Sequence, residues 1–358
     1  MHWELSDEQE MFASSLREWI TAKFPTETVR ELQGSSSSPF TDALIGEGWW
    51  GVGYPEQAGG QGGGVLELAL AAREFGRAAV PDSGWLAAAM VAPLLTDADL
   101  TALVEGQRRA VLATRADRPP VTGPDAIDAE TAGDTLSLVV PHVLGAAEAE
   151  VFVVPVRGPD GPALAQVAAA DAVITADDLL DRSRSTATVE FRDAPVAGLV
   201  PVDAESLAAS AQRAPVLVAA DALGAAERML DLAVGYSKQR KQFGQLIGGF
   251  QAVKHACAQM LVTVEASYSS ALYAAAAVDA ALADAPTIAA VAKAQVTRSV
   301  ADLADTALTV HGAIGYTWEH DLHLFYKRAK LDRTLFGTPA AWNERIAVAL
   351  LGPVNSPS

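Results

Sequence analysis

The spacing of apolar and polar positions over residues 1–107 is that of helices separated by loops. In residues 5–20, LSDEQEMFASSLREWI, Ser6 stands three positions before Gln9, which is the spacing of a capping box ahead of an amphipathic helix. The glycine-rich stretch GGQGGG at 59–64 lacks the Gly-Lys-Ser/Thr ending of a phosphate-binding loop, and no strand leads into it. We therefore predict an N-terminal helical domain in which this stretch is a turn before the next helix.

The pattern changes over residues 108–202. Short runs rich in β-branched residues, TLSLVV, EVFVVPV and STATVEF, are separated by segments rich in proline, glycine and aspartate. This predicts a middle β domain, either a barrel or a sandwich.

Helical spacing returns over residues 203–358. Val216, Ala220, Leu223, Leu230 and Val234 recur at steps of three, four or seven, so they share one face of a helix. The alanine-rich run ALYAAAAVDAALADA permits close helix packing and predicts a four-helix bundle with subunit contacts. Because aspartates interrupt the longest apolar runs, we predict no membrane span, and the acidic start argues against a signal peptide, so a cytoplasmic protein is expected.

The charge balance limits the ligands that the chain can attract. With 44 acids against 26 bases, the formal net charge is −18, which argues against nucleic-acid binding. An anionic ligand would need a local basic pocket. The single cysteine, Cys257, excludes a disulfide within the chain.

Two segments carry candidate chemistry. The first is RKQFGQLIGGFQ at 240–251, which has two interpretations: a cationic last helical turn followed by a terminating glycine, or a guanidinium that captures an anion beside the ring of Phe243. The second is residues 310–338, where HGAIG breaks a helix. There His320 and His323, with Glu319 nearby, offer a metal face without a clear third ligand, so we predict no metal site.

These two segments, together with GWWGVGYPEQAGGQGGG at 48–64, resemble the acyl-CoA dehydrogenase family over nearly the whole chain. RKQFGQLIGGFQAVKH resembles the family's Arg-x-x-Phe-Gly…Phe-Gln signature, and VHGAIGYTWEHDLHLFYKRAK resembles its Gln-x-x-Gly-Gly-x-Gly-Tyr signature. The resemblance implies an α+β multidomain fold with an N-terminal helical domain (1–107), a middle β-barrel (108–202) and a C-terminal four-helix bundle (203–358), assembled as dimers or tetramers.

The resemblance also implies an activity. Family members bind FAD at a subunit interface and dehydrogenate an acyl-CoA: a carboxylate removes the α proton, the flavin accepts the β hydride, and electron-transfer flavoprotein is the expected acceptor. Residues of this chain that match the family's cofactor-binding positions are Arg240, Gln242, Phe243, Gln251, Gly312 and Thr338. Thr309 stands where glutamine is usual, and Ala313 replaces the second glycine of the turn.

The half of the site that a family member supplies to its own flavin is largely missing. The stretch around Thr114 lacks the Glu-Pro-x-x-Gly-Ser-Asp loop, and residues 139–147 lack a clear aromatic-Ile-Thr segment. Phe336 occupies the place of the catalytic glutamate, and Ala214 the place of the alternative base. Because general-base catalysis needs a positioned proton acceptor, we assign no catalytic residue.

The chain therefore resembles the degenerate subunit of actinobacterial heteromeric acyl-CoA dehydrogenases. The leading hypothesis is a non-catalytic subunit that shares FAD with a catalytic partner and serves an acyl-CoA substrate, with sterol side-chain thioesters favoured by the resemblance. Two alternatives stay open: a homo-oligomeric flavoenzyme whose base is Glu319 or Asp332, and a flavin-free structural subunit.

Overall fold

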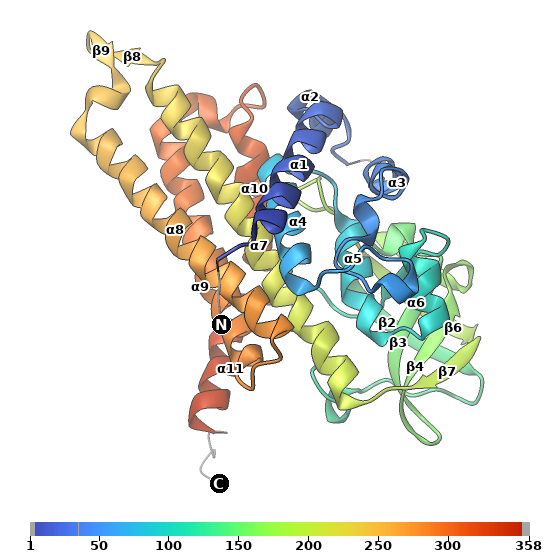
Figure 1. Cartoon of the computed structure of the whole chain (residues 1–358). Helices are drawn as coiled ribbons and strands as arrows, with labels where there is room; N and C mark the ends of the chain where they lie inside the picture. The colour runs from blue at the N-terminus through green and yellow to red at the C-terminus, as the bar shows by residue number, and fades with distance from the viewer. Residues whose placement is uncertain (1–3, 35, 353–358) are drawn as a thin grey trace. The chain divides into compact units, whose positions relative to one another are not determined.

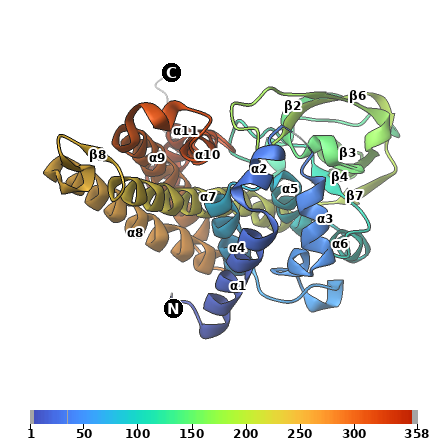
Figure 2. The ribbon, with the colours of Figure 1, turned by 90° about the horizontal axis from the view of Figure 1, so that it is seen from above.

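The computed structural model describes residues 4–34 and 36–352, drawn in Figures 1 and 2. The chain forms two compact units. The first contains Met1–Arg30, Ala69–Val80 and Pro215–Ser358, and the second contains Glu31–Leu68 and Pro81–Ala214. Three of the four unit boundaries fall inside helices, namely α2 (Thr26–Glu31), α4 (Val65–Ala78) and α7 (Ala204–Ser237), and the fourth lies between Val80 and Pro81.

The N-terminal part is helical, as predicted. Its helices are α1 (Asp7–Lys23), α2 (Thr26–Glu31), α3 (Ser38–Gly46), α4 (Val65–Ala78), α5 (Ser83–Val91) and α6 (Asp97–Val104). The capping box at the start of α1 is confirmed, because the Gln9 N–H donates to Ser6 Oγ at 3.3 Å and the Ser6 N–H donates to Gln9 Oε1 at 3.0 Å. Residues 59–64 form a turn region that precedes α4, with Gly62 bridged to Tyr54.

The middle of the chain contains two sheets. The four-stranded sheet has the order β1-β3-β4-β7, with strands Ala110–Leu112, Val151–Gly158, Gly161–Ala168 and Gly198–Pro201. The three-stranded sheet has the order β2-β6-β5, with strands Thr135–Leu144, Thr186–Pro195 and Ala172–Ala176. Apolar side chains from both sheets form one buried cluster, in which the rings of Phe152 and Phe191 meet edge to face with centroids 5.6 Å apart.

The β-barrel implied by the family resemblance is not what the described residues form. The edge strands of the two sheets do not pair with one another, so each sheet stays open. β1 has three residues and β5 is largely exposed, so these edges offer little apolar surface for further pairing. The middle domain is a pair of sheets over a shared core.

The C-terminal part is helical, as predicted. It contains α7 (Ala204–Ser237), α8 (Gln251–Asp279), α9 (Ala285–His311), α10 (Leu322–Asp332) and α11 (Pro339–Leu351). Within the first unit α9 packs against α8, α10 and α11. A two-stranded hairpin, β8 (Lys241–Gln242) and β9 (Gln245–Leu246), stands at the end where α7 leads into α8 (Figures 1 and 2).

One helix departs from the prediction that no segment resembles a membrane span. By length and composition alone, α8 could cross a membrane, and 39% of its most apolar window is buried within the protein. The aspartates that interrupt the apolar run, Asp279 and Asp284, lie at the end of α8 and beyond it, so they leave the helix interior apolar. Core helices of soluble proteins share this composition.

Candidate functional site

The hairpin that carries Arg240 begins after α7 has ended. The helix stops at Ser237, and the Ile247 N–H closes the hairpin base by donating to the Arg240 carbonyl at 2.8 Å. Arg240 is therefore not in the last turn of a helix, and the interpretation of the cations as partners of the helix dipole is wrong. The side chains of Arg240, Lys241 and Gln242 are exposed.

Phe243 sits at the turn of this hairpin in an unusual conformation. Its φ is +50° and that of Gly244 is +81°, so both turn residues have the left-handed backbone that a two-residue hairpin loop demands. An aromatic residue in this region is strained by about 1–2 kcal/mol, because its Cβ approaches the following carbonyl. The residue is also 92% exposed, and its ring and that of Phe250 stand edge to face at a centroid distance of 6.2 Å.

The turn at Gly312 lies at the same end of the bundle as the hairpin. Tyr236, in the last turn of α7, stacks on His311, the last residue of α9, with ring centroids 4.9 Å apart. Gly312 follows at once with a φ of +63°. Gln251 begins α8 on the other side of the hairpin and is exposed. We call Arg240, Gln242, Phe243, Gln251 and Gly312 the tip group.

The histidines of the second segment do not form a metal site. His320 packs its ring against His311 at a centroid distance of 4.5 Å, whereas His323 meets the ring of Trp318 at 4.9 Å. Burial lowers the pKa of His311 and His320, and lowers that of His323 to about 4. No cluster of ligands that could hold a metal ion occurs between residues 4 and 352, position 35 aside.

Phe336 and Thr338 lie in a separate place, the loop 333–338 between α10 and α11. Phe336 is 1% exposed and has a φ of +54°, and its carbonyl accepts the Trp342 indole N–H at 2.9 Å. The Thr338 hydroxyl caps α11 by accepting from the Ala341 N–H at 3.3 Å. No proton acceptor occupies the Phe336 side-chain position, and Ala214, at the alternative position, is fully buried.

A buried lysine that we did not single out from the sequence fixes this loop. Lys293 of α9 is 0% exposed, and its Nζ donates to the carbonyls of Asp332 at 2.9 Å and Gly337 at 3.0 Å. Lys293 shares a helix face with Ala289 and Val300, which are also buried. Lys293 could have been identified from the sequence, because it is a charged residue at an apolar position of an alanine-rich helix.

The tip group and the loop 333–338 are far apart in one chain. Gly312 follows Lys293 by 19 residues along α9, which corresponds to about 28 Å at the rise of an α-helix. Figure 1 shows the hairpin and α11 at opposite ends of the bundle. The cofactor-binding positions predicted from the sequence therefore fall into two groups that one chain does not bring together.

The two alternative bases lie in these same regions. The side chain of Glu319 is exposed, and its carbonyl accepts from Arg30 Nη2 at 3.2 Å. Asp332 is 0% exposed, at the end of α10 beside Lys293. Asp332 is closed to any substrate, whereas Glu319 is accessible.

Comparison with known protein families adds an independent result. The N-terminal domain of acyl-CoA dehydrogenases matches residues 6–99, and their C-terminal domain matches residues 209–351. IpdE2 of Mycobacterium tuberculosis is 32% identical over 289 residues, which cover 80% of this chain and 78% of IpdE2. FadE34 of the same organism is 34% identical over 356 residues, covering 96% of this chain, and the chain spans about half of FadE34, 48%.

Solved structures show the same fold. The ChsE4-ChsE5 complex from M. tuberculosis matches with a TM-score of 0.84 and 26% identity, covering 100% of both chains. A structure described as a Tcur3481-Tcur3483 steroid ACAD variant matches with a TM-score of 0.80 and 26% identity, covering 95% of this chain and 97% of that one. Together with the family matches and IpdE2, these likenesses establish that the chain belongs to the acyl-CoA dehydrogenase family.

Proposed function

We propose that the chain is a non-catalytic subunit of a hetero-oligomeric, FAD-dependent acyl-CoA dehydrogenase, and that its tip group completes the FAD site of a catalytic partner. The observation that carries this proposal is the contrast between Phe243 and Phe336. Phe243 is strained and exposed among polar residues, whereas Phe336 is buried where a base would be needed. Strain that persists at an exposed residue is a common mark of a binding site.

The tip group fits the chemistry of FAD. Arg240 and Lys241 are exposed cations in an acidic chain, and a guanidinium matches the fork geometry of a pyrophosphate. The Phe243 ring offers an apolar face for a flat heterocycle, and the amide of Gln251 can donate or accept a hydrogen bond. When bound, FAD supplies the acceptor for a hydride. In this proposal Arg240 holds the pyrophosphate, Phe243 packs near the flavin and Gln251 orients it.

Two of the comparisons support a hetero-oligomer. The ChsE4-ChsE5 structure is described as a complex, its name pairs two proteins, and the chain of it that matches is covered over its full length. FadE34 contains about as much sequence again outside the matched part, as expected if two domains of this kind act as a pair. The steroid ACAD structure supports a sterol-derived acyl-CoA as the substrate class. Electron-transfer flavoprotein would then accept the electrons.

The test is flavin content in a reconstituted complex. The chain is co-expressed with a catalytic acyl-CoA dehydrogenase subunit from the same genome, and flavin absorbance is measured per complex. Arg240→Ala should weaken flavin binding by about tenfold or more, because a charge-assisted hydrogen bond is lost. The control Arg118→Ala, at another exposed arginine, should leave flavin content unchanged. Equal flavin content in the Arg240→Ala complex would refute the role of the tip group.

A homo-oligomeric enzyme that uses Glu319 as its base is the second candidate, favoured by the exposure of that side chain near the tip. The absorbance spectrum of the chain purified alone separates the two. Strong flavin bands with turnover of an acyl-CoA would replace the first proposal with this one. The third possibility is a flavin-free structural subunit. In that case the flavin occupancy of the catalytic partner should not change when this chain is omitted.

A further inference from the structure

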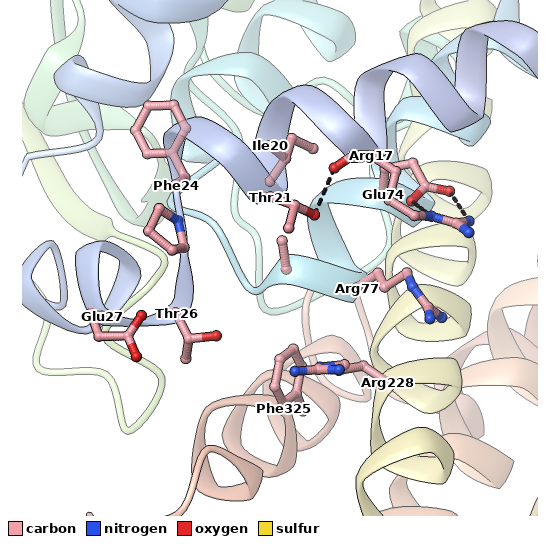
Figure 3. Close-up of a pocket in the computed structure, with 12 residues that line it drawn as sticks. Arg17, Ile20, Thr21, Phe24, Thr26, Glu27, Glu74, Arg77, Arg228 and Phe325 are labelled. Carbon is pink, nitrogen blue, oxygen red and sulfur yellow. Dashed lines mark hydrogen bonds and ion pairs between the residues drawn. The ribbon is translucent and has the colours of Figure 1, made fainter. Parts of the chain in front are cut away.

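A cavity of about 350 Å³ lies among α1, α4, α7 and α10, within the first unit and apart from the tip group. Its volume falls at the lower end of the range of small-molecule sites, about 300–1,000 Å³. Part of the wall is apolar, because Ile20, Phe24 and Phe325 line the cavity and are themselves between 1% and 7% exposed. Figure 3 shows Ile20 and Phe24 on one side of the cavity and Phe325 on the other, with arginine, threonine and glutamate side chains between and beside them.

Two of the three arginines that line the cavity are already paired. Arg17 makes a bidentate ion pair with the buried carboxylate of Glu74, with both N–O distances 2.7 Å. Arg77 donates through Nη1 to Glu227 at 3.2 Å and through Nη2 to Asp231. These guanidiniums therefore have their charges balanced within the protein.

Arg228 differs from both. In residues 4–34 and 36–352, no carboxylate lies within ion-pair distance of its half-buried guanidinium. Its neighbour in sequence, Glu227, is engaged by Arg73 at 2.6 Å and by Arg77. The remaining acid of the lining, Glu27, is exposed and stands across the cavity from Arg228 in Figure 3.

This arrangement defines the ligand that would suit the cavity. One uncompensated guanidinium favours one negative charge, and its planar fork matches a carboxylate. A second charge on the ligand would face Glu27 and be repelled. The apolar part of the wall favours a short hydrocarbon tail, because burying such a tail removes apolar surface from water.

We propose that this cavity is a binding site for a small amphipathic monocarboxylate. Arg228 grips the carboxylate, and the tail lies on Ile20, Phe24 and Phe325. The site is separate from the proposed flavin contacts, since Arg228 lies nine residues before the end of α7, roughly 14 Å along the helix axis.

Isothermal titration calorimetry with hexanoate tests the proposal, with 1-hexanol as the neutral analogue of the same length. Hexanoate should bind with one site per chain and at least tenfold more tightly than hexanol. Arg228→Gln should weaken hexanoate binding by about tenfold or more and leave hexanol unchanged. The control Arg298→Gln, at an exposed position of α9, should bind hexanoate as the wild type does.

The proposal would be overturned by no saturable hexanoate binding at millimolar concentration, by equal affinity for hexanoate and hexanol, or by undiminished binding in Arg228→Gln. Because that substitution could disturb the fold, its melting temperature is compared with that of Arg228→Lys. The lysine variant keeps the charge and should bind hexanoate more tightly than the glutamine variant, and equal affinities would also overturn the proposal. The titration involves no flavin, so its failure leaves the proposed subunit function untouched.

Discussion

The guanidinium of Arg328 and the carboxylate of Asp221 form a bidentate ion pair in the interior of the first unit. Nε donates to Oδ1 at 2.9 Å, Nη2 donates to Oδ2 at 2.7 Å, and both side chains are at most 1% exposed. Arg328 Nη1 also donates to the Val80 carbonyl at 3.2 Å. Val80 is the last residue of Ala69–Val80, one of the three segments of the first unit. The pair fixes α10 against α7.

Removing one partner of this pair should be costly. Asp221→Ala removes the carboxylate that pairs with a buried guanidinium and should lower the free energy of unfolding by about 3–5 kcal/mol. Urea denaturation measures the loss. The control Asp302→Ala, at an exposed position of α9, should change the free energy by less than about 0.5 kcal/mol. A loss below about 1 kcal/mol in Asp221→Ala would mean that the charge is balanced by other groups.

A second stability prediction concerns Lys293. Lys293→Met removes the donor from two buried carbonyls, and we expect a loss of about 2–4 kcal/mol in the free energy of unfolding. Amide hydrogen exchange should accelerate in the loop 333–338, since the Gly337 carbonyl anchors it. Lys330→Met is the matched control: Lys330 Nζ also donates to a carbonyl, that of Ala301 at 2.8 Å, but its ion-pair partner Asp305 is 57% exposed, so its loss should cost less than about 1 kcal/mol. Unchanged exchange in the loop would contradict the anchoring role.

The crossing of α4 and α7 depends on a glycine. A Cβ added at Gly224 would lie 1.8 Å from the Arg73 carbonyl oxygen, so Gly224→Ala must push the helices apart and should cost about 3 kcal/mol or prevent folding. Gly235, later in α7, has nothing within 4 Å of its added Cβ. Gly235→Ala should stabilise the chain by up to about 1 kcal/mol, because alanine favours the helix. Thermal melting of both variants tests the two predictions. Similar changes in melting temperature would show that α4 and α7 do not pack closely at Gly224.

Replacing Phe243 should have opposite effects on the stability of the chain and on flavin binding in the complex. Phe243→Gly relieves the left-handed strain and removes almost no buried surface, so the chain alone should keep or gain up to about 1 kcal/mol of stability. In the co-expressed complex the same substitution should reduce flavin occupancy, because the apolar contact is lost. Loss of stability in the isolated chain would show instead that Phe243 supports the hairpin.

Stability should fall in mild acid. The pKa of His323 is about 4 in the folded chain, below the value of about 6.5 expected for an unfolded histidine, and burial shifts His311 and His320 in the same direction. The unfolded state therefore binds protons first as the pH drops below about 6.5, and the free energy of unfolding declines until the pH approaches 4. Urea midpoints measured at about pH 7.5, 6 and 5 test this trend. His323→Gln should show a shallower decline, and an identical slope would exclude His323 as a source.

Local patterns predicted much of this fold. The capping box at Ser6 and Gln9, the helical faces and the β-branched strands follow from short-range preferences that sequence displays directly. Strand β4, GPALAQVA, was missed because it lacks a β-branched run, and its pairing with β3 is tertiary in origin. Whether two sheets close into a barrel depends on the pairing of their edges, which no single strand encodes.

The candidate site was predictable only where it follows a family motif. Arg240 and Phe243 were identified from the motif, but the hairpin that exposes them was not, because RKQFG suits a helix end equally well. The Arg328–Asp221 pair joins positions 107 residues apart, and nothing local to either residue indicates the other. Lys293 stands out as a charged residue on an apolar helix face, but its contacts could not be predicted, since the carbonyls of Asp332 and Gly337 lie on another helix and loop.

The separation of the tip group from the loop 333–338 along α9 has a stoichiometric consequence. Under the proposed function, each chain's tip in a two-fold pair of family members would reach the other chain's loop, so a symmetric pair would have two composite sites. A pair that contains this chain and one complete relative would have one intact composite site, because the second would carry Phe336 in place of a base. Such an assembly would hold one catalytically competent flavin for every two chains. Its activity would therefore depend on equal amounts of the two chains.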